Sequence, residues 1–489
     1  MLRELTGLRE DAAGLAARLS RGRYRRAAGL PREATLREMV RAHPLCCSAD
    51  GLAQAEEALQ AALSEDPRRP GRLARLTSLR DFLRRARALS LEPGAAQELF
   101  DLPSRNLVRL PGDAGLHGAL PPVRVGRDLP LERSRDRRAE MEAALAAALQ
   151  PLDGARSAVF EAAQGAGASC PADAGALCEQ FLQSTQALAD DLGAWLLERS
   201  AGVRRGSFAG HDVLHLQHAP RCLSAFPRGE MLRTVRRWAE MLRFDIGADG
   251  AVKLDEEDRP LKWPGAHAEP LDPPWEVGVA FLPGEGPRAL GSLLAALGVA
   301  KLRAGPGSDA PPEDLWLGDP EVAAACAALL EGLLREPDFV RRCARADLSR
   351  DDHRAIAIAA VFDARVEAAR ALAEQVAHES GFGARTAQAH RDLFARATGA
   401  ELAAGLALAD LDAWSPSLAV LRGRMLAARA REFLRDLYDE DFWRNPRTVQ
   451  SLQGLWGRGG RATAAELWAE MGSEPSLEPL LHEYSAACD

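Results

Sequence analysis

The chain of 489 residues has 47% hydrophobic residues, 5% aromatic residues and a formal net charge of -8. This length and apolar content are sufficient for a large folded core, which argues against intrinsic disorder. The mildly acidic balance argues against nucleic-acid binding, because recognition of phosphates requires a clustered basic excess. The start, MLRELTGLRED, does not resemble a signal peptide, and no stretch reaches the roughly 18 apolar residues of a membrane span. We therefore expect a cytoplasmic protein that binds neither nucleic acid nor a membrane.

The eight cysteines are scattered along the chain and form no C-x-x-C motif. This spacing predicts neither a disulfide framework nor a structural zinc cluster. We expect reduced thiols, most of them buried.

Apolar residues recur at helical spacing in the first part of the chain. Examples are LAQAEEALQAALSE at 52–65 and LARLTSLRDFLRRARAL at 73–89. A stretch rich in Pro and Gly follows at 102–131, after which helical periodicity continues to about residue 200. This pattern predicts an N-terminal helical lobe that comprises residues 1–205.

The pattern changes between residues 244 and 285, where two strand-like pieces near 251–255 and 276–282 are separated by a Pro-rich segment that we expect to form a loop. Helical segments then continue to the C-terminus. We therefore predict a mostly α-helical, two-lobed protein. Its second part, residues 206–489, is expected to form a core with a small sheet at about 250–283 and C-terminal helices.

The helical run ALGSLLAALGVAK at 289–301 contains Gly298. A glycine inside a helix costs about 1 kcal/mol relative to alanine, so its presence indicates close backbone packing.

The segments LLAALGVAK at 293–301 and LGDPEVAAACAALLEGLL at 317–334 resemble two helices of the zinc metallopeptidases of the thimet oligopeptidase and oligoendopeptidase F type. In that family the first helix carries Leu-Leu-His-Glu-x-Gly-His, and the second, which starts after Gly-Asp, carries a glutamate ligand. The resemblance implies a zincin-like helical fold with the small sheet next to the active-site helix. It places the first zinc-binding histidine on Ala295, the general-base glutamate on Ala296, the second histidine on Val299 and the third ligand on Ala324.

Zinc needs at least three protein ligands with lone pairs, and peptide hydrolysis needs a carboxylate that accepts a proton from the bound water. The methyl and isopropyl groups at the four positions supply neither. Family members also carry tyrosines that hydrogen-bond the carbonyl under attack, but the matching segment DLDAWSPSLAVLRGR at 410–424 has none, and Pro416 and Val420 stand at the expected places. The resemblance therefore implies a degenerate member without catalytic residues, zinc or another cofactor.

A second group of candidate ligands lies upstream, in FAGHDVLHLQHAP. His211, His215 and His218 are spaced i, i+4 and i+7, which places three imidazoles on one face of a helix next to Asp212. This spacing is compatible with a rebuilt metal site. The family segment also begins His-Asp-x-Leu-His without forming the zinc site, so structural or cleft-lining hydrogen bonds are the alternative.

Three functional hypotheses follow. The first is a catalytically inactive metallopeptidase homologue, a pseudopeptidase, that binds a peptide or a protein partner, for which an active paralogue is one candidate. The second is a hydrolase with a metal at His211, His215 and His218. The third is a structural scaffold whose cleft has collapsed.

Overall fold

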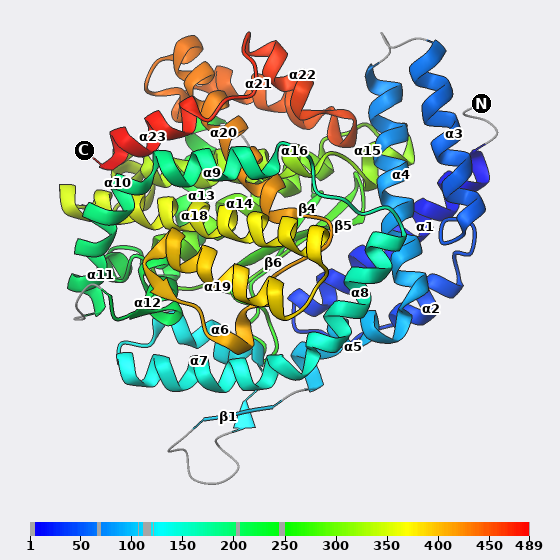
Figure 1. Cartoon of the computed structure of the whole chain (residues 1–489). Helices are drawn as coiled ribbons and strands as arrows, with labels where there is room; N and C mark the ends of the chain where they lie inside the picture. Colours follow the sequence, from blue (N-terminus) through cyan, green and yellow to red (C-terminus); the bar gives the residue numbers. More distant parts are fainter. Residues whose placement is uncertain are drawn as a thin grey trace.

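The computed structural model describes residues 5–65, 70–105, 107–110, 119–120, 122–201, 206–243 and 250–488. Most of these residues lie in helices, which surround a small sheet (Figure 1). The predicted mostly helical fold class with a small sheet is thereby confirmed.

The first helices are α1 (Thr6–Ala27), α2 (Leu36–Arg41), α3 (Ala49–Glu65), α4 (Pro70–Leu91) and α5 (Pro93–Arg105). The next elements are β1 (Val108–Arg109), β2 (Ala119–Leu120), α6 (Pro122–Asp128), α7 (Arg135–Leu149), α8 (Asp153–Gly165), α9 (Ala174–Ser184), α10 (Gln186–Leu188) and α11 (Ala194–Ala201). The middle of the chain forms β3 (Phe208–Ala209), α12 (Gly210–Gln217), α13 (Met231–Leu242), β4 (Val252–Asp255), β5 (Ala266–Asp272), β6 (Glu276–Phe281), α14 (Pro287–Ala304), α15 (Pro312–Trp316) and α16 (Pro320–Glu331). The last elements are α17 (Pro337–Phe339), α18 (Arg350–Ser380), α19 (Ala384–Thr398), β7 (Ala400–Glu401), α20 (Pro416–Tyr438), α21 (Pro446–Trp456), α22 (Ala464–Glu470) and α23 (Glu478–Cys488).

Local sequence signals explain where several helices begin. Thr35 and Glu38 form a reciprocal capping box at the start of α2, and Ser349 and Asp352 form another at the start of α18. Each box satisfies backbone N–H groups that the first helical turn would otherwise leave without partners. Pro287 occupies the first position of α14, where a missing N–H group costs nothing.

Two large apolar clusters hold the molecule together. One is confined to the N-terminal helices and includes Leu15, Leu76 and Leu83. The larger one extends from Ala174 to Cys488 and therefore includes α9 and α11. The predicted boundary between residues 205 and 206 stays a prediction, because the clusters report packing rather than independent folding, and residues 202–205 lie outside the described residues.

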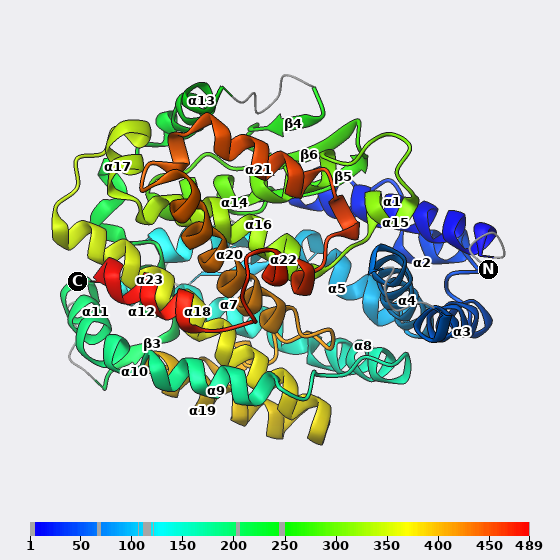
Figure 2. The ribbon, with the colours of Figure 1, turned by 90° about the horizontal axis from the view of Figure 1, so that it is seen from above.

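The 31-residue helix α18 crosses the larger cluster and is buried along most of its length. Many of its buried side chains are alanine methyl groups, which allow α9, α19 and α20 to pack closely around it (Figures 1 and 2). Across the described residues, no helix combines the length and apolarity required to span a bilayer.

The main sheet has three strands in the order β4-β6-β5, with β4 parallel and β5 antiparallel to β6. The strands predicted near 251–255 and 276–282 are present as β4 and β6. The loop expected between them is wrong over Ala266–Asp272, which forms β5. Pro270 is tolerated there because β5 is an edge strand and its pairing is irregular between Pro270 and Asp272.

Candidate functional site

Helices α14 and α16 cross in close contact at Gly298. A Cβ added to Gly298 would lie 2.1 Å from the carbonyl oxygen of Cys326. Gly291, nearer the start of α14, lies beside Glu331, whereas Gly298 lies beside Cys326. The residue numbers thus rise along one helix as they fall along the other, so the two helices run antiparallel. The close packing expected from a glycine inside this helix is confirmed, and its partner is the backbone of α16.

Helix α16 makes a second close crossing with α20. A Cβ added to Gly423 would lie 2.5 Å from the Cβ atom of Ala324. The methyl group of Ala324 thus packs against the backbone of α20, and α16 is held between two helices that each supply a glycine at the crossing.

The four positions at which the resemblance places zinc-site residues lie on this pair of helices. Ala296 is buried, and Ala295, Val299 and Ala324 are half-buried. Their side chains carry no lone pairs, so they do not fit a zinc ion. Ala295 and Val299 share a helical face with Ser292, whose hydroxyl accepts a 2.7 Å hydrogen bond from the backbone N–H of Ala266 in β5.

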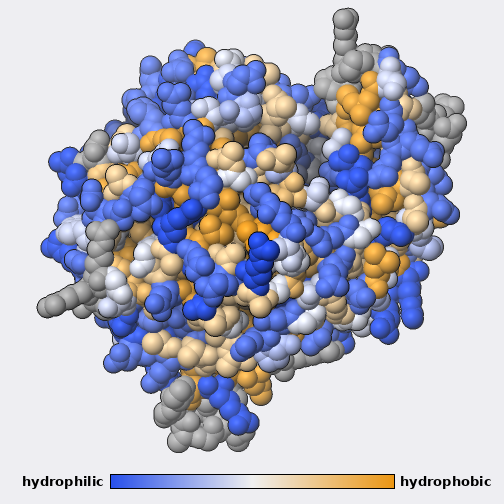
Figure 3. Space-filling view, viewed as in Figure 1, coloured by the Kyte–Doolittle hydropathy of each residue, from blue (hydrophilic) through white to orange (hydrophobic). Residues whose placement is uncertain are grey.

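A large cavity lies beside this helix pair, with a volume of about 1160 Å³. Its wall is formed by α1, α4 and α8 on one side, and on the other by the C-terminal end of α14, the segments 316–321 and 411–414, and the start of α22. Figure 2 shows the N-terminal helices facing α16 and α22, and the surface in Figure 3 is indented between α4 and the C-terminal helices. Ala323 of α16 belongs to the wall.

The segment 410–424 contributes to the same cavity. Asp412 and Trp414 line it, and Pro416 begins α20 directly afterwards. The chain has three tyrosines, and none of them belongs to this wall. Tyr484 is buried between helices, with its hydroxyl 3.4 Å from the carbonyl oxygen of Ala360.

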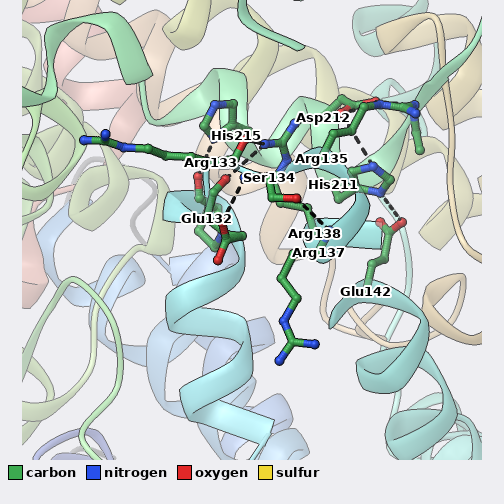
Figure 4. Close-up of polar contacts among 12 residues, drawn as sticks. Glu132, Arg133, Ser134, Arg135, Arg137, Arg138, Glu142, His211, Asp212 and His215 are labelled. Atoms are coloured by element: carbon green, nitrogen blue, oxygen red, sulfur yellow. Dashed lines mark hydrogen bonds and ion pairs between the residues drawn. The ribbon is translucent and has the colours of Figure 1, made fainter. Parts of the chain in front are cut away.

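The first histidine of the upstream group belongs to a buried polar cluster between α7 and α12 (Figure 4). His211 Nδ1 lies 2.9 Å from Glu142 Oε2. Asp212 accepts hydrogen bonds from Arg135 at 3.0 Å and from Arg138 at 3.1 Å. Burial tends to raise the pKa of Asp212, but Arg135, the Ala209 N–H group, His211 and Arg138 outweigh it and lower the pKa.

The other two histidines have different partners. His215 Nδ1 donates a 2.7 Å hydrogen bond to the carbonyl oxygen of Pro130, and His218 Nδ1 donates a 3.0 Å hydrogen bond to the carbonyl oxygen of Leu214. Burial lowers the pKa of both, that of His218 to about 4 with Arg288 as a second cause. The helical face therefore brings the rings near one another, but each Nδ1 is directed to a separate acceptor.

Within the described ranges, no group of three or more His, Cys, Asp or Glu side chains is arranged to hold a metal ion. The eight cysteines are free thiols, and all except Cys170 are buried. The proposal of a metal at His211, His215 and His218 thus gains no support from the geometry and stays a prediction.

The arginines of the cavity are not among the site residues that the sequence predicts. Arg303 lies one turn after Val299 on α14, so the helical spacing could have placed it on the same face. Arg85 on α4 comes from a part of the chain far from the motif. No local pattern distinguishes it from the other arginines of α4.

No family model and no curated protein matches this sequence. Solved structures match along the chain. A carboxypeptidase from Pyrococcus furiosus is 12% identical, with a TM-score of 0.60 over 100% of this chain and 98% of that one. The M32 carboxypeptidase from Deinococcus radiodurans is 14% identical, with a TM-score of 0.57 over 100% of this chain and 99% of that one.

A Bacillus anthracis protein assigned as oligoendopeptidase F is 12% identical, with a TM-score of 0.57 over 89% of this chain and 82% of that one. The protein thus has the zincin-like fold of these peptidases, as the resemblance implied. The two carboxypeptidases match this chain over almost their whole length, and the sequence resemblance did not name carboxypeptidases.

Proposed function

We propose that the protein is a catalytically inactive metallopeptidase homologue that binds a peptide, or an extended segment of a protein partner, in the cavity between its N-terminal helices and α14, α16 and α22. The observation that carries this proposal is the combination of a large cavity with small apolar side chains at the four positions of the family's zinc site. The cavity, at about 1160 Å³, is slightly larger than the roughly 300–1,000 Å³ of typical ligand pockets, which leaves room for a peptide.

The chemistry of the four side chains supports loss of catalysis rather than a change of metal. Ala295, Val299 and Ala324 offer no ligand, and Ala296 offers no general base. The cavity wall also offers no tyrosine that could donate to a developing oxyanion. A cavity of this volume beside such side chains is suited to binding without turnover.

Three measurements test the proposal together. The metal content of the purified protein and its activity on casein and on quenched fluorescent peptides should both be at background. Binding of a fluorescent peptide library should nevertheless be measurable. The hydrolase hypothesis would be favoured instead by two results. The wild-type protein would contain stoichiometric zinc and cleave peptides, and replacing His211 and His215 by alanine would abolish both.

A cavity-filling variant locates the binding. Ala323 lies on the wall and is half-buried, so Ala323→Trp would occupy the cavity with an indole ring. Ala469, exposed on α22 and outside the wall, provides the matched control Ala469→Trp. Peptide binding should be lost only in Ala323→Trp. Absence of peptide binding by the wild-type protein would favour the scaffold hypothesis.

A further inference from the structure

Four arginines line the cavity, and two of them form no ion pair with a carboxylate of the described residues. Arg23 forms a bidentate pair with Glu269 of β5, and Arg156 pairs with Asp153 at 2.8 Å. Arg85 is placed over the ring of Trp414, with its guanidinium carbon 5.4 Å from the ring centroid. Arg303 donates to the carbonyl oxygen of Leu317.

The carboxylates of the wall are already engaged in contacts of their own. These contacts are Asp81 with Arg80, Asp319 with the N–H groups of Glu321 and Ala464, Glu321 with Arg422, Asp412 with the N–H group of Trp414, and Glu466 with the N–H group of Thr463. Two of them cap helices, and two pair with arginines other than Arg85 and Arg303. Arg85 and Arg303 are therefore the cavity arginines whose N–H groups form no ion pair with a carboxylate of the described residues.

The surroundings of both arginines are partly desolvated. Burial lowers the pKa of Arg85, although Asp412 and Asp81 act in the opposite direction. Burial also lowers the pKa of Arg303, although Glu269 acts in the opposite direction. The charge of Arg23 contributes to both decreases, which indicates that the three guanidinium groups share one region of the cavity. A carboxylate placed there would gain charge-assisted hydrogen bonds in a medium less polar than water.

The position of Arg303 connects this charged region with the former zinc-site face. Arg303 follows Val299 by one helical turn, and Val299 follows Ala295 by another, so the three side chains form one stripe on α14. Apolar side chains of Leu73, Phe82 and Leu89 line the opposite wall on α4. The cavity thus offers cationic donors beside an apolar surface.

We propose that the cavity selects peptides with acidic side chains, whose carboxylates bind Arg303 and Arg85 while neighbouring apolar side chains pack against α4. This inference rests on the proposed function, because it names the class of peptide that the cavity receives. The recognised chemistry is a side-chain carboxylate on an extended peptide.

The test uses a synthetic library of hexapeptides built from Glu, Gln, Lys, Leu and Phe. Acetylated N-termini and amidated C-termini leave side chains as the only carboxylates. Peptides that co-elute with the protein are sequenced by mass spectrometry. Glu should be enriched over Gln by about tenfold, the ratio expected for one hydrogen bond to a charged group, and high salt should reduce this ratio.

The variants Arg303→Gln and Arg85→Gln should each reduce the enrichment several-fold while still binding apolar peptides. Arg236→Gln is the matched control, since Arg236 is exposed on α13 and outside the cavity wall. Equal recovery of Glu and Gln by the wild-type protein would overturn the inference and leave the proposed function standing. Failure to recover any peptide would overturn the proposed function and the inference with it.

Discussion

Helices α12 and α14 each bury one face beside the core, but the side chains on these two faces differ in polarity. On α12, His211 and Asp212 are charged or polar, buried and matched by Glu142, Arg135 and Arg138. On α14, the corresponding face holds methyl and isopropyl groups that need no partner. Side chains without polar atoms need no partner when they are buried, whereas a buried polar group without a partner lowers stability.

The comparison indicates why the buried polar residues of α12 contribute to stability. The cluster on α12 ties α7 to α12, so each of its members is required by the others for stability. The positions on α14 carry no such dependence, because their side chains have no polar atoms. Substitutions in the two helices should therefore differ in how much stability they remove.

The largest loss of stability is expected for Asp212→Ala. The side chain of Arg138 is 1% exposed and would be left as a buried charge without its carboxylate, which typically costs about 3–5 kcal/mol. Urea unfolding followed by circular dichroism measures the change. Asp258→Ala is the control, because Asp258 pairs with Arg228 at the surface, where a pair contributes about 1 kcal/mol or less. Equal losses in the two variants would contradict the role assigned to the buried cluster.

Glu374 is a buried carboxyl group that forms no ion pair with the described residues. Burial, together with the charge of Asp412, raises its pKa to about 9. A folded-state pKa above the unfolded one means that the folded protein holds the proton more tightly, so stability should fall as pH rises toward 9, by about 1.4 kcal/mol per pH unit. Glu374→Gln mimics the protonated acid and should remove this part of the pH dependence.

Glu483 provides the opposite case. Burial tends to raise its pKa, but Arg431 and Arg335 outweigh burial and lower the pKa to about 2. Its contribution should be present throughout neutral pH and be lost only as pH falls toward 2. Glu483→Gln should therefore lower the free energy of unfolding by the same amount at pH 6 and pH 9. The difference in free energy of unfolding between wild type and Glu374→Gln should change between these two pH values. Parallel pH profiles for the two variants would refute both assignments.

A smaller effect is expected at the helix crossing. In Gly298→Ala the new methyl group would meet the carbonyl oxygen of Cys326, so α14 and α16 must separate, at a cost of about 1–3 kcal/mol. Gly454→Ala on α21 is the control, since its added methyl group has no atom within 4 Å, and it should be neutral or stabilising by up to about 1 kcal/mol. A neutral Gly298→Ala would mean that the crossing is looser than described.

The sequence predicts much of this architecture because helical periodicity and the spacing of the two motif segments are local properties. It predicts β4 and β6 but not β5, since Pro270 signals a loop unless its place at a sheet edge is known. It also predicts that His211, His215 and His218 share a face. Their acceptors, such as Glu142 and the Pro130 carbonyl, come from distant segments, and so do the Arg85 side chain and the wall opposite Arg303. The positions of these groups depend on tertiary packing, which a local sequence pattern does not encode.

The smallest change in stability is expected at half-buried positions of α14 whose side chains have no polar atoms. Ala295→His and Val299→His together add two rings to half-buried positions at i and i+4, and we expect the free energy of unfolding to change by about 1 kcal/mol or less. Imidazoles at this spacing can bind zinc jointly, so calorimetric titration should detect weak binding that the wild-type protein lacks.

Addition of Ala324→Glu tests whether the space between α14 and α16 can accept a third polar side chain. Position 324 faces Gly423, and a carboxylate there would have to displace the backbone of α20 or turn away from it. We therefore expect the triple variant to be less stable than the double variant and to bind zinc no more tightly, and adding Ala296→Glu at a buried position should destabilise it further. Tighter zinc binding by the triple variant would show that α16 can still turn residue 324 toward α14. The close packing between α16 and α20 would then be only one of two arrangements open to this site.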